Sequence, residues 1–79
     1  MKESRDVTIE DITTLVGVHL GKRRVRPDDR FLEDLGAESM DLVNIAGAVE
    51  DKYRIRINES EIGGIRTSSD LLRLVQRLL

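Results

Sequence analysis

The sequence contains no cysteine or tryptophan, and only one histidine, one proline, one tyrosine and one phenylalanine. Without cysteine, neither a disulfide framework nor a thiolate metal site can form. A single imidazole, that of His19, leaves little for zinc binding or acid–base catalysis, so we expect it to be partly buried and structural. With only Phe31 and Tyr53 as aromatic residues, the core must be built from Ile, Leu and Val.

The sequence also lacks long apolar runs. Residues 1–12 show no continuous apolar stretch and therefore predict no signal peptide, and no segment approaches the roughly 20 apolar residues that a membrane span requires. The 13 basic and 15 acidic residues give a net charge of −2, which does not favour nucleic acid or an anionic membrane as partner. We therefore expect a single stand-alone domain over residues 1–79 that is monomeric and cytoplasmic.

Helical signals begin near the start of the chain. Thr8 followed by Asp11 forms something close to a capping box, and apolar residues then recur at three- and four-residue spacing. Gly21 is well placed to end this first helix. Residues 25–34 predict a loop, because Pro27 disfavours helix at the residue before it.

The stretch after this loop carries the clearest helical pattern. Phe31 and Leu35 are expected to fasten the loop to the core, Gly36 allows a tight turn, and a second helix is predicted from about Ser39. Gly47 inside this helix costs about 1 kcal/mol relative to alanine, a cost that we expect a packing need to offset. The apolar face of the helix comprises Leu42, Ile45, Ala46, Val49 and Tyr53.

The rest of the chain predicts one short and one longer helix. Ile55 and Ile57 are expected in an extended connector with inward side chains, because no second strand is available to pair with them. A one-turn helix over residues 59–62 follows, and one of residues 67–69 opens the last helix. Three substantial helices and one short helix predict an all-α, small four-helix bundle.

Acidic side chains gather around the second helix. They could mark a metal site or a paired-carboxylate active centre, although simple solvation is the ordinary state of acids on a helix surface. Because the basic residues concentrate elsewhere, we expect an acidic face suited to steering a basic partner. The acids are Glu33, Asp34, Glu38, Asp41, Glu50 and Asp51.

Ser39 has three interpretations when only the residues are considered. A serine that opens a helix is most often just its N-cap. A catalytic nucleophile would need a positioned base and an oxyanion site, and the sequence supplies no candidate base. The third interpretation is a covalent attachment point, where a phosphodiester would face the positive end of the helix dipole.

The stretch FLEDLGAESMDLV, residues 31–43, closely resembles the signature of acyl carrier proteins, in which an acidic lead-in and Leu-Gly precede Asp-Ser-Leu at the start of the second helix. The order and spacing of the helices are similar as well, from about Thr8 to Leu78. This resemblance implies an acyl-carrier-like bundle in which Ser39 carries a 4′-phosphopantetheine arm, transferred from coenzyme A by a phosphopantetheinyl transferase.

The same resemblance implies a protein that is not an enzyme, and the residues themselves supply no metal-binding constellation. Its arm would hold acyl groups as thioesters for acyl-loading, condensing and acyl-transfer enzymes of fatty-acid, polyketide or related biosynthesis. Family members present the second helix to basic patches on such enzymes, so Glu38, Met40 and Asp41 are expected to recognise partners. Many members also shelter the acyl chain between helices, which makes the apolar side of this helix a candidate pocket wall.

Some positions depart from the family pattern. Glu38 and Met40 stand where Asp and Leu are usual, and Asn44 occupies a commonly acidic place. Several arginines make the chain less acidic than the usual fatty-acid carriers, so we hypothesise a carrier for a specialised pathway. These arginines are Arg54, Arg56, Arg66, Arg73 and Arg77.

Two alternatives remain open at this point. A peptidyl or aminoacyl carrier shares the fold and the arm, although residues 36–39 lack the second glycine that is usual at its attachment site. An unmodified helical protein-interaction module is the other alternative, in which Ser39 is only a cap and the acidic helix docks a partner.

Overall fold

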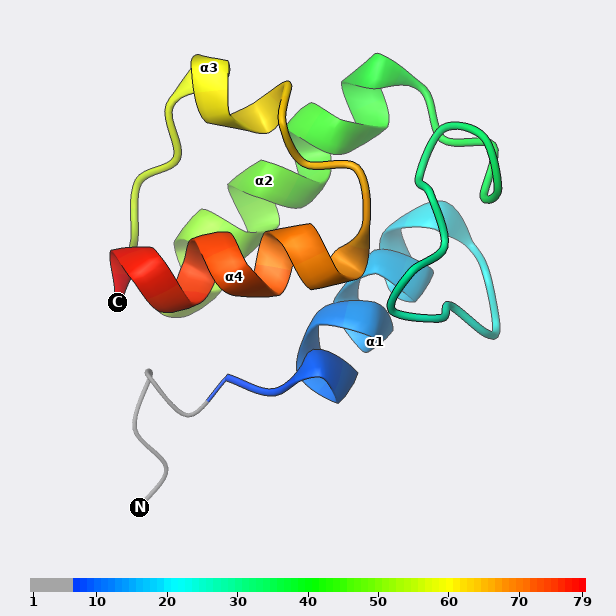
Figure 1. The fold of residues 1–79 in the computed structure, drawn as a ribbon, viewed down its shortest axis with the longest axis horizontal. Helices are drawn as coiled ribbons and strands as arrows, with labels where there is room; N and C mark the ends of the chain where they lie inside the picture. The colour runs from blue at the N-terminus through cyan, green and yellow to red at the C-terminus, as the bar shows by residue number, and fades with distance from the viewer. Residues whose placement is uncertain (1–6) are drawn as a thin grey trace.

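The computed structural model describes residues 7–79, and this part of the chain forms a small four-helix bundle (Figure 1). The predicted all-α architecture is confirmed: no strand forms between residues 7 and 79, where Arg30 and Thr67 make one isolated antiparallel bridge. Residues 1–6, half of the segment without a signal-peptide pattern, lie outside the described residues. The helices are α1, Ile9–Leu20; α2, Ser39–Tyr53; α3, Glu59–Ile62; and α4, Ser68–Leu78.

Local sequence signals determine where the two flanking helices begin. The predicted capping box at α1 is confirmed, because the Asp11 N–H donates to Thr8 Oγ1 at 3.2 Å and the Thr8 N–H donates to Asp11 Oδ2 at 3.1 Å. Thr67 and Asp70 form the same reciprocal pair at α4, at 3.1 and 3.2 Å. Gly21 ends α1 with a φ of 67°, a left-handed conformation that glycine adopts without strain.

The core is aliphatic and lies between the helices. α1 packs against α2 and α4, and α3 lies against α2. The predicted apolar face of α2 is confirmed, because Ile45, Ala46, Val49 and Tyr53 are buried and Leu42 is half-buried. The other two long helices contribute the buried residues Ile12, Val16, Leu71, Leu74 and Val75.

The long loop between α1 and α2 covers the end of the bundle opposite the C-terminus of α4 (Figure 1). Its backbone is tied to the residues around the start of α4: the Phe31 N–H donates to the Arg66 carbonyl at 2.9 Å, and the Ser69 N–H donates to the Pro27 carbonyl at 3.0 Å. Phe31 and Leu35 are both buried, so the two predicted apolar anchors of the loop are confirmed.

Two helical glycines have opposite surroundings. A Cβ at Gly17 would lie 2.8 Å from the carbonyl oxygen of Lys22, so the chain leaving α1 requires glycine there. At Gly47 nothing lies within 4 Å of an added Cβ, and the expected packing need is therefore wrong. The cost of about 1 kcal/mol for this glycine has no steric compensation.

The connector after α2 has the predicted form, whereas His19 does not have the predicted burial. Ile57 is buried and Ile55 half-buried in a segment without helix or strand, as predicted. His19 is exposed, so the expected partial burial is wrong. The buried face of α1 is centred on Ile12 and Val16 and ends before the last turn, which carries His19.

Candidate functional site

A tight turn presents Ser39 at the start of α2. Gly36 adopts a φ of 69°, and the N–H of the buried residue Ala37 donates to the Phe31 carbonyl at 2.9 Å. The loop anchor and the site are therefore connected through one hydrogen bond. Ser39 itself is exposed, and its hydroxyl makes no hydrogen bond with any other residue between 7 and 79.

The cap of α2 is Glu38, so the interpretation of Ser39 as the N-cap is wrong. Glu38 has an extended backbone, with φ −104° and ψ 167°, and its N–H donates to Asp41 Oδ2 at 2.8 Å. This bond forms because an acid stands three residues after Glu38, whereas the residue three after Ser39 is Leu42. Ser39 is thus the first helical residue, with a hydroxyl that has no capping task.

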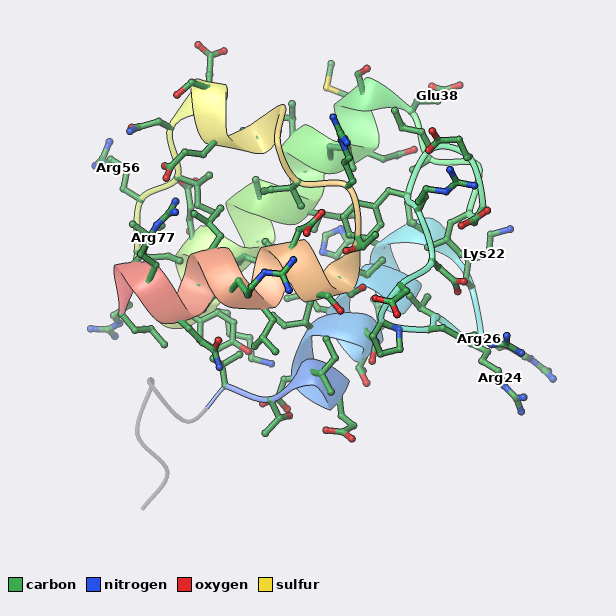
Figure 2. All side chains as sticks on the ribbon, viewed as in Figure 1. Lys22, Arg24, Arg26, Glu38, Arg56 and Arg77 are labelled. Carbon is green, nitrogen blue, oxygen red and sulfur yellow. The ribbon has the colours of Figure 1, made fainter. Side chains whose placement is uncertain are left out.

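The three predicted recognition residues differ in their surroundings. Glu38 is exposed and Met40 is 66% exposed, whereas Asp41 is half-buried and holds the helix start. Figure 2 shows Glu38 projecting at one end of the molecule, and Arg56 and Arg77 at the opposite end. Glu38 and Met40 are therefore accessible to a partner beside Ser39, while the Asp41 carboxylate already serves the fold.

Two further acids of the predicted acidic face also serve the backbone. Asp34 Oδ2 accepts from the Arg30 N–H at 2.8 Å, a bond that, together with the Arg30 charge, lowers the pKa of Asp34 despite partial desolvation. Glu50 Oε2 accepts from the Ile57 N–H at 2.7 Å and so fastens the connector to α2. Between residues 7 and 79, no three acidic or histidine side chains gather in a way that would hold a metal ion.

Sequence reasoning missed one apolar side chain at the site. Val43 is 50% exposed and lies four residues after Ser39, which places both on the same face of α2. Met40 lies three residues before Val43 and is its neighbour on the helix surface. The signal was present in the helical spacing, but Val43 lies outside the stripe that forms the core.

A small cavity of about 150 Å³ opens beside the first turn of α2. Leu42, from the apolar side of α2, forms part of its wall together with Phe31 and Ile65. Two charged residues, Glu33 and Arg66, also line it. Because Leu42 follows Ser39 by three residues, the cavity begins one helical turn from the serine.

Residues 10–75 match the family model described as the phosphopantetheine attachment site. The chain belongs to this family of carrier proteins. The meromycolate extension acyl carrier protein of Mycolicibacterium aurum is 37% identical over 54 residues, which cover 68% of this chain and 56% of that protein. The chain thus matches only about half the length of the mycobacterial relatives. The acyl carrier protein of Helicobacter hepaticus is 34% identical over 71 residues, covering 87% of this chain and 93% of the relative.

Solved structures of carrier proteins share the fold. An acyl carrier protein from Thermotoga maritima superposes with a TM-score of 0.75 at 28% identity, covering 95% of this chain and 89% of that one. A 3-oxo-butyl carrier from the actinorhodin polyketide synthase of Streptomyces coelicolor gives a TM-score of 0.75 at 26% identity, with 92% and 91% covered. The resemblance to acyl carrier proteins is therefore confirmed.

Membership of this family defines the cofactor, which is a covalently attached 4′-phosphopantetheine. An exposed hydroxyl on the first residue of a helix fits such a group, because the α2 N-terminus favours a nearby negative charge. In the described part of the chain, no helix is long and apolar enough to cross a membrane.

Proposed function

We propose that this carrier is modified on Ser39 and holds acyl groups as thioesters for partner enzymes. The observation that carries the proposal is the division of labour between neighbours: Asp41 caps α2 at Glu38, and the exposed Ser39 hydroxyl makes no hydrogen bond with the described residues. Modifying Ser39 therefore removes no hydrogen bond from this part of the fold.

The loading step exchanges the phosphoanhydride bond of coenzyme A for a phosphodiester on Ser39. Ser39 Oγ bonds to the phosphorus that carries pantetheine in coenzyme A, the bond from that phosphorus to its bridging oxygen breaks, and adenosine 3′,5′-bisphosphate leaves. The Ser39 proton passes to a base of the transferase. The attached arm supplies a thiol that forms thioesters, and the N–H groups in the first turn of α2 stabilise the new negative charge. In this proposal the chain presents cargo and catalyses no reaction.

The proposed partners are the transferase and the acyl-loading, condensing and acyl-transfer enzymes that use the cargo. Glu38 and Met40 are exposed beside Ser39 and suit a partner surface with basic and apolar groups. We propose a specialised pathway, since the five arginines of residues 54–77 make the chain less acidic than common fatty-acid carriers. A polyketide or related pathway is consistent with these features. Restoration of normal fatty-acid synthesis in a host that lacks its housekeeping carrier would contradict the specialised role.

We further propose that residues 1–79 act as one monomeric carrier domain in the cytoplasm. The family match over residues 10–75 supports a single carrier unit. Sedimentation of the purified chain at micromolar concentration tests the monomer. A concentration-dependent dimer would contradict it.

Intact mass spectrometry tests the attachment directly. The chain is incubated with coenzyme A and a broad-specificity phosphopantetheinyl transferase, and we expect a gain equal to one phosphopantetheine. Ser39→Ala should show no gain, whereas Ser60→Ala, which removes another exposed helical serine, should load normally. A gain that persists in Ser39→Ala moves the attachment elsewhere. No gain with several transferases favours the unmodified interaction module.

A further inference from the structure

A run of cations follows α1 at the start of the long loop. Lys22, Arg23, Arg24 and Arg26 lie within five residues, and all four are exposed. None of these side chains makes an ion pair or hydrogen bond with any residue between 7 and 79. We call these four residues the basic patch. Neither the core nor the proposed attachment at Ser39 uses their charges.

The helix dipole accounts for only part of the basic patch. A cation is stabilised near a helix C-terminus, but this effect falls off within the last turn. α1 ends at Leu20 with Gly21 as its cap, so Lys22 follows the helix end directly, whereas Arg24 and Arg26 lie beyond it. Like charges this close in the chain also repel one another. The stability of the fold therefore gives no reason for the two outer arginines.

The backbone beneath the basic patch is held in place. The Lys22 N–H donates to the Gly17 carbonyl at 2.9 Å, and the Arg26 N–H donates to Asp29 Oδ2 at 2.8 Å. Between them, Val25 is half-buried and packs against the core. A partner would therefore need to order only the side chains of the patch, which lowers the entropic cost of binding.

The acids next to the basic patch are engaged elsewhere. The Asp28 carboxylate accepts from the Ser69 hydroxyl at 3.3 Å, and the Asp29 carboxylate accepts from a backbone N–H of the patch itself. One ion pair does form in the same loop, between Arg30 and Asp34 at 3.5 Å. The loop thus contains a paired arginine beside a patch whose guanidinium and ammonium groups remain available to an external anion.

The basic patch lies at the end of the molecule that presents Ser39. Figure 2 shows Lys22, Arg24 and Arg26 at the same end as Glu38, the residue before the serine. A partner that approaches this end meets cations on the loop and an exposed acid at the start of α2. Charges of both signs therefore surround the approach to the serine.

This mixture of signs selects among anionic partners. A nucleic acid or an anionic membrane is uniformly negative, so it would face Glu38 together with the basic patch, on a chain whose net charge is already −2. A folded protein can place carboxylates opposite the patch and a basic group opposite Glu38. Carboxylates also match the planar fork of an arginine. The charges at this end of the molecule therefore favour a protein surface.

We propose that the basic patch docks an acidic surface of a partner enzyme and that, with Glu38 of opposite sign, it sets the orientation in which that enzyme approaches Ser39. The inference rests on the proposed function, in which partner enzymes act on the carrier. An enzyme docked the other way round would bring like charges together, which costs affinity and suppresses the wrong arrangement.

The test uses a defined acidic probe on the unmodified chain. An alanine-based helical peptide with four glutamates along one face represents the acidic protein surface, and the same peptide with glutamines is its neutral control. Amide chemical shifts of residues 22–26 report binding. Single-stranded DNA with the same number of charges and phosphatidylserine vesicles represent the other anionic partners, with vesicle binding measured by co-sedimentation.

We expect the glutamate peptide to shift the amides of the basic patch and to bind more tightly than the DNA or the vesicles. Arg24→Gln/Arg26→Gln should weaken peptide binding about fivefold, the size expected for the loss of two exposed ion pairs. Arg54→Gln/Arg56→Gln removes the same charge from two exposed arginines after α2, and this matched control should leave the affinity nearly unchanged.

Two further measurements examine the electrostatic origin of the binding. Raising the salt concentration to about 0.5 M should abolish peptide binding, because exposed charges are then screened over a few ångströms. Glu38→Gln should raise the affinity for DNA, because it removes an acid that a uniformly negative partner faces.

Each contrary outcome overturns a stated part of the inference. Equal binding of the glutamine peptide, or no binding of the glutamate peptide, would exclude recognition of carboxylates by the basic patch. Tighter binding of DNA or vesicles would overturn the protein partner. Equal losses in the two double variants would show that total charge, not position, is responsible. Loading of Ser39 is measured separately by intact mass, so its failure would remove the attachment while the peptide result stands.

Discussion

Ser39 and Asp41 have different tasks at the start of α2: the Asp41 carboxylate caps the helix, and Ser39 presents an exposed hydroxyl. The Asp41 carboxylate accepts from the Glu38 N–H at 2.8 Å, and the Ser39 hydroxyl stays exposed. Asp41→Ala should therefore lower the free energy of unfolding by about 1 kcal/mol, the usual cost of a lost cap. Ser39→Ala should change it by less than about 0.5 kcal/mol, as for an ordinary surface position. Urea unfolding of the unmodified proteins measures both values, and equal losses would return the capping role to Ser39.

Gly17 and Gly47 both lie in long helices, and replacing each by alanine should change the stability in opposite directions. Gly47→Ala should raise the free energy of unfolding by up to about 1 kcal/mol, because the new methyl group meets open space and alanine is the better helix former. Gly17→Ala should instead destabilise the domain, because the methyl would lie 2.8 Å from the Lys22 carbonyl oxygen. Thermal unfolding of both variants checks the opposite signs. A destabilised Gly47→Ala would mean that the space beside Gly47 cannot accept a methyl group.

At the scale of elements, the loop between α1 and α2 depends on one side chain. Phe31 is 1% exposed, whereas its neighbour Leu32 is 48% exposed. Phe31→Ala should cost about 3–5 kcal/mol, which in so small a domain is enough to prevent stable folding. Leu32→Ala removes three carbons from a half-exposed side chain and should cost well under 1 kcal/mol. Circular dichroism of the two variants distinguishes them, and similar stabilities would mean that the loop is not anchored through Phe31.

The start of α4 gives a prediction for acid stability. Burial alone would raise the pKa of Asp70, but the N–H groups of Arg66 and Thr67, at 3.0 and 3.2 Å, and the charge of Arg73 outweigh it and leave the pKa below its ordinary 3.8. A carboxyl whose pKa is lower in the folded state stabilises the fold above its unfolded pKa, and this contribution is lost as the pH falls through the folded pKa.

The stability of the unmodified sequence should therefore decline below about pH 4 more steeply than that of Asp70→Asn, which cannot titrate. Urea midpoints between about pH 3 and pH 6 measure the two slopes. Parallel curves would show that Asp70 has the same proton affinity in the folded and unfolded chain.

Helical spacing and capping chemistry explain why the sequence predicted these elements so closely. The capping box at Thr8 and the apolar face of α2 are local patterns, and each was placed correctly. At α4 the sequence narrowed the start to residues 67–69, and the structure places the cap at Thr67. The cap of α2 was misplaced by one residue, since serine is a common N-cap and the Glu38–Asp41 pair was not weighed against it. The open space at Gly47 and the exposure of His19 depend on tertiary packing, which residue spacing does not report.

Residue spacing predicted the functional site less completely than it predicted the fold. Periodicity located Ser39 at a helix start, and only the family resemblance predicted the phosphopantetheine. The cavity could not be foreseen, because Leu42 and Arg66 are far apart in the sequence and meet only through the tie between residue 31 and residue 66. A loop residue and a residue before α4 therefore shape the surroundings of the first turn of α2.

For the whole molecule, charges of both signs lie at the end that carries Ser39. Figure 2 shows Glu38 at the same end as Lys22, Arg24 and Arg26, and Arg56 at the opposite end. Glu38→Lys should slow loading by the broad-specificity transferase about fivefold, mainly through slower association, because a charge at the rim of an interface acts on the encounter rate. The far-end variant Arg56→Glu should leave loading nearly unchanged. Loading rates at low and high salt measure this, and equal slowing by both variants would mean that total charge matters more than position.

The backbone ties between the long loop and α4 have a consequence for biosynthesis. Phe31 and Pro27 find their partners late in synthesis, because Arg66 follows Phe31 by 35 residues and Ser69 follows Pro27 by 42. While the ribosome is still producing the intervening residues, Phe31 has no completed core to enter and the turn before Ser39 is not held. We therefore expect the turn that presents Ser39 to reach its final form only once α4 has left the exit tunnel, so that the proposed modification of Ser39 would follow completed folding.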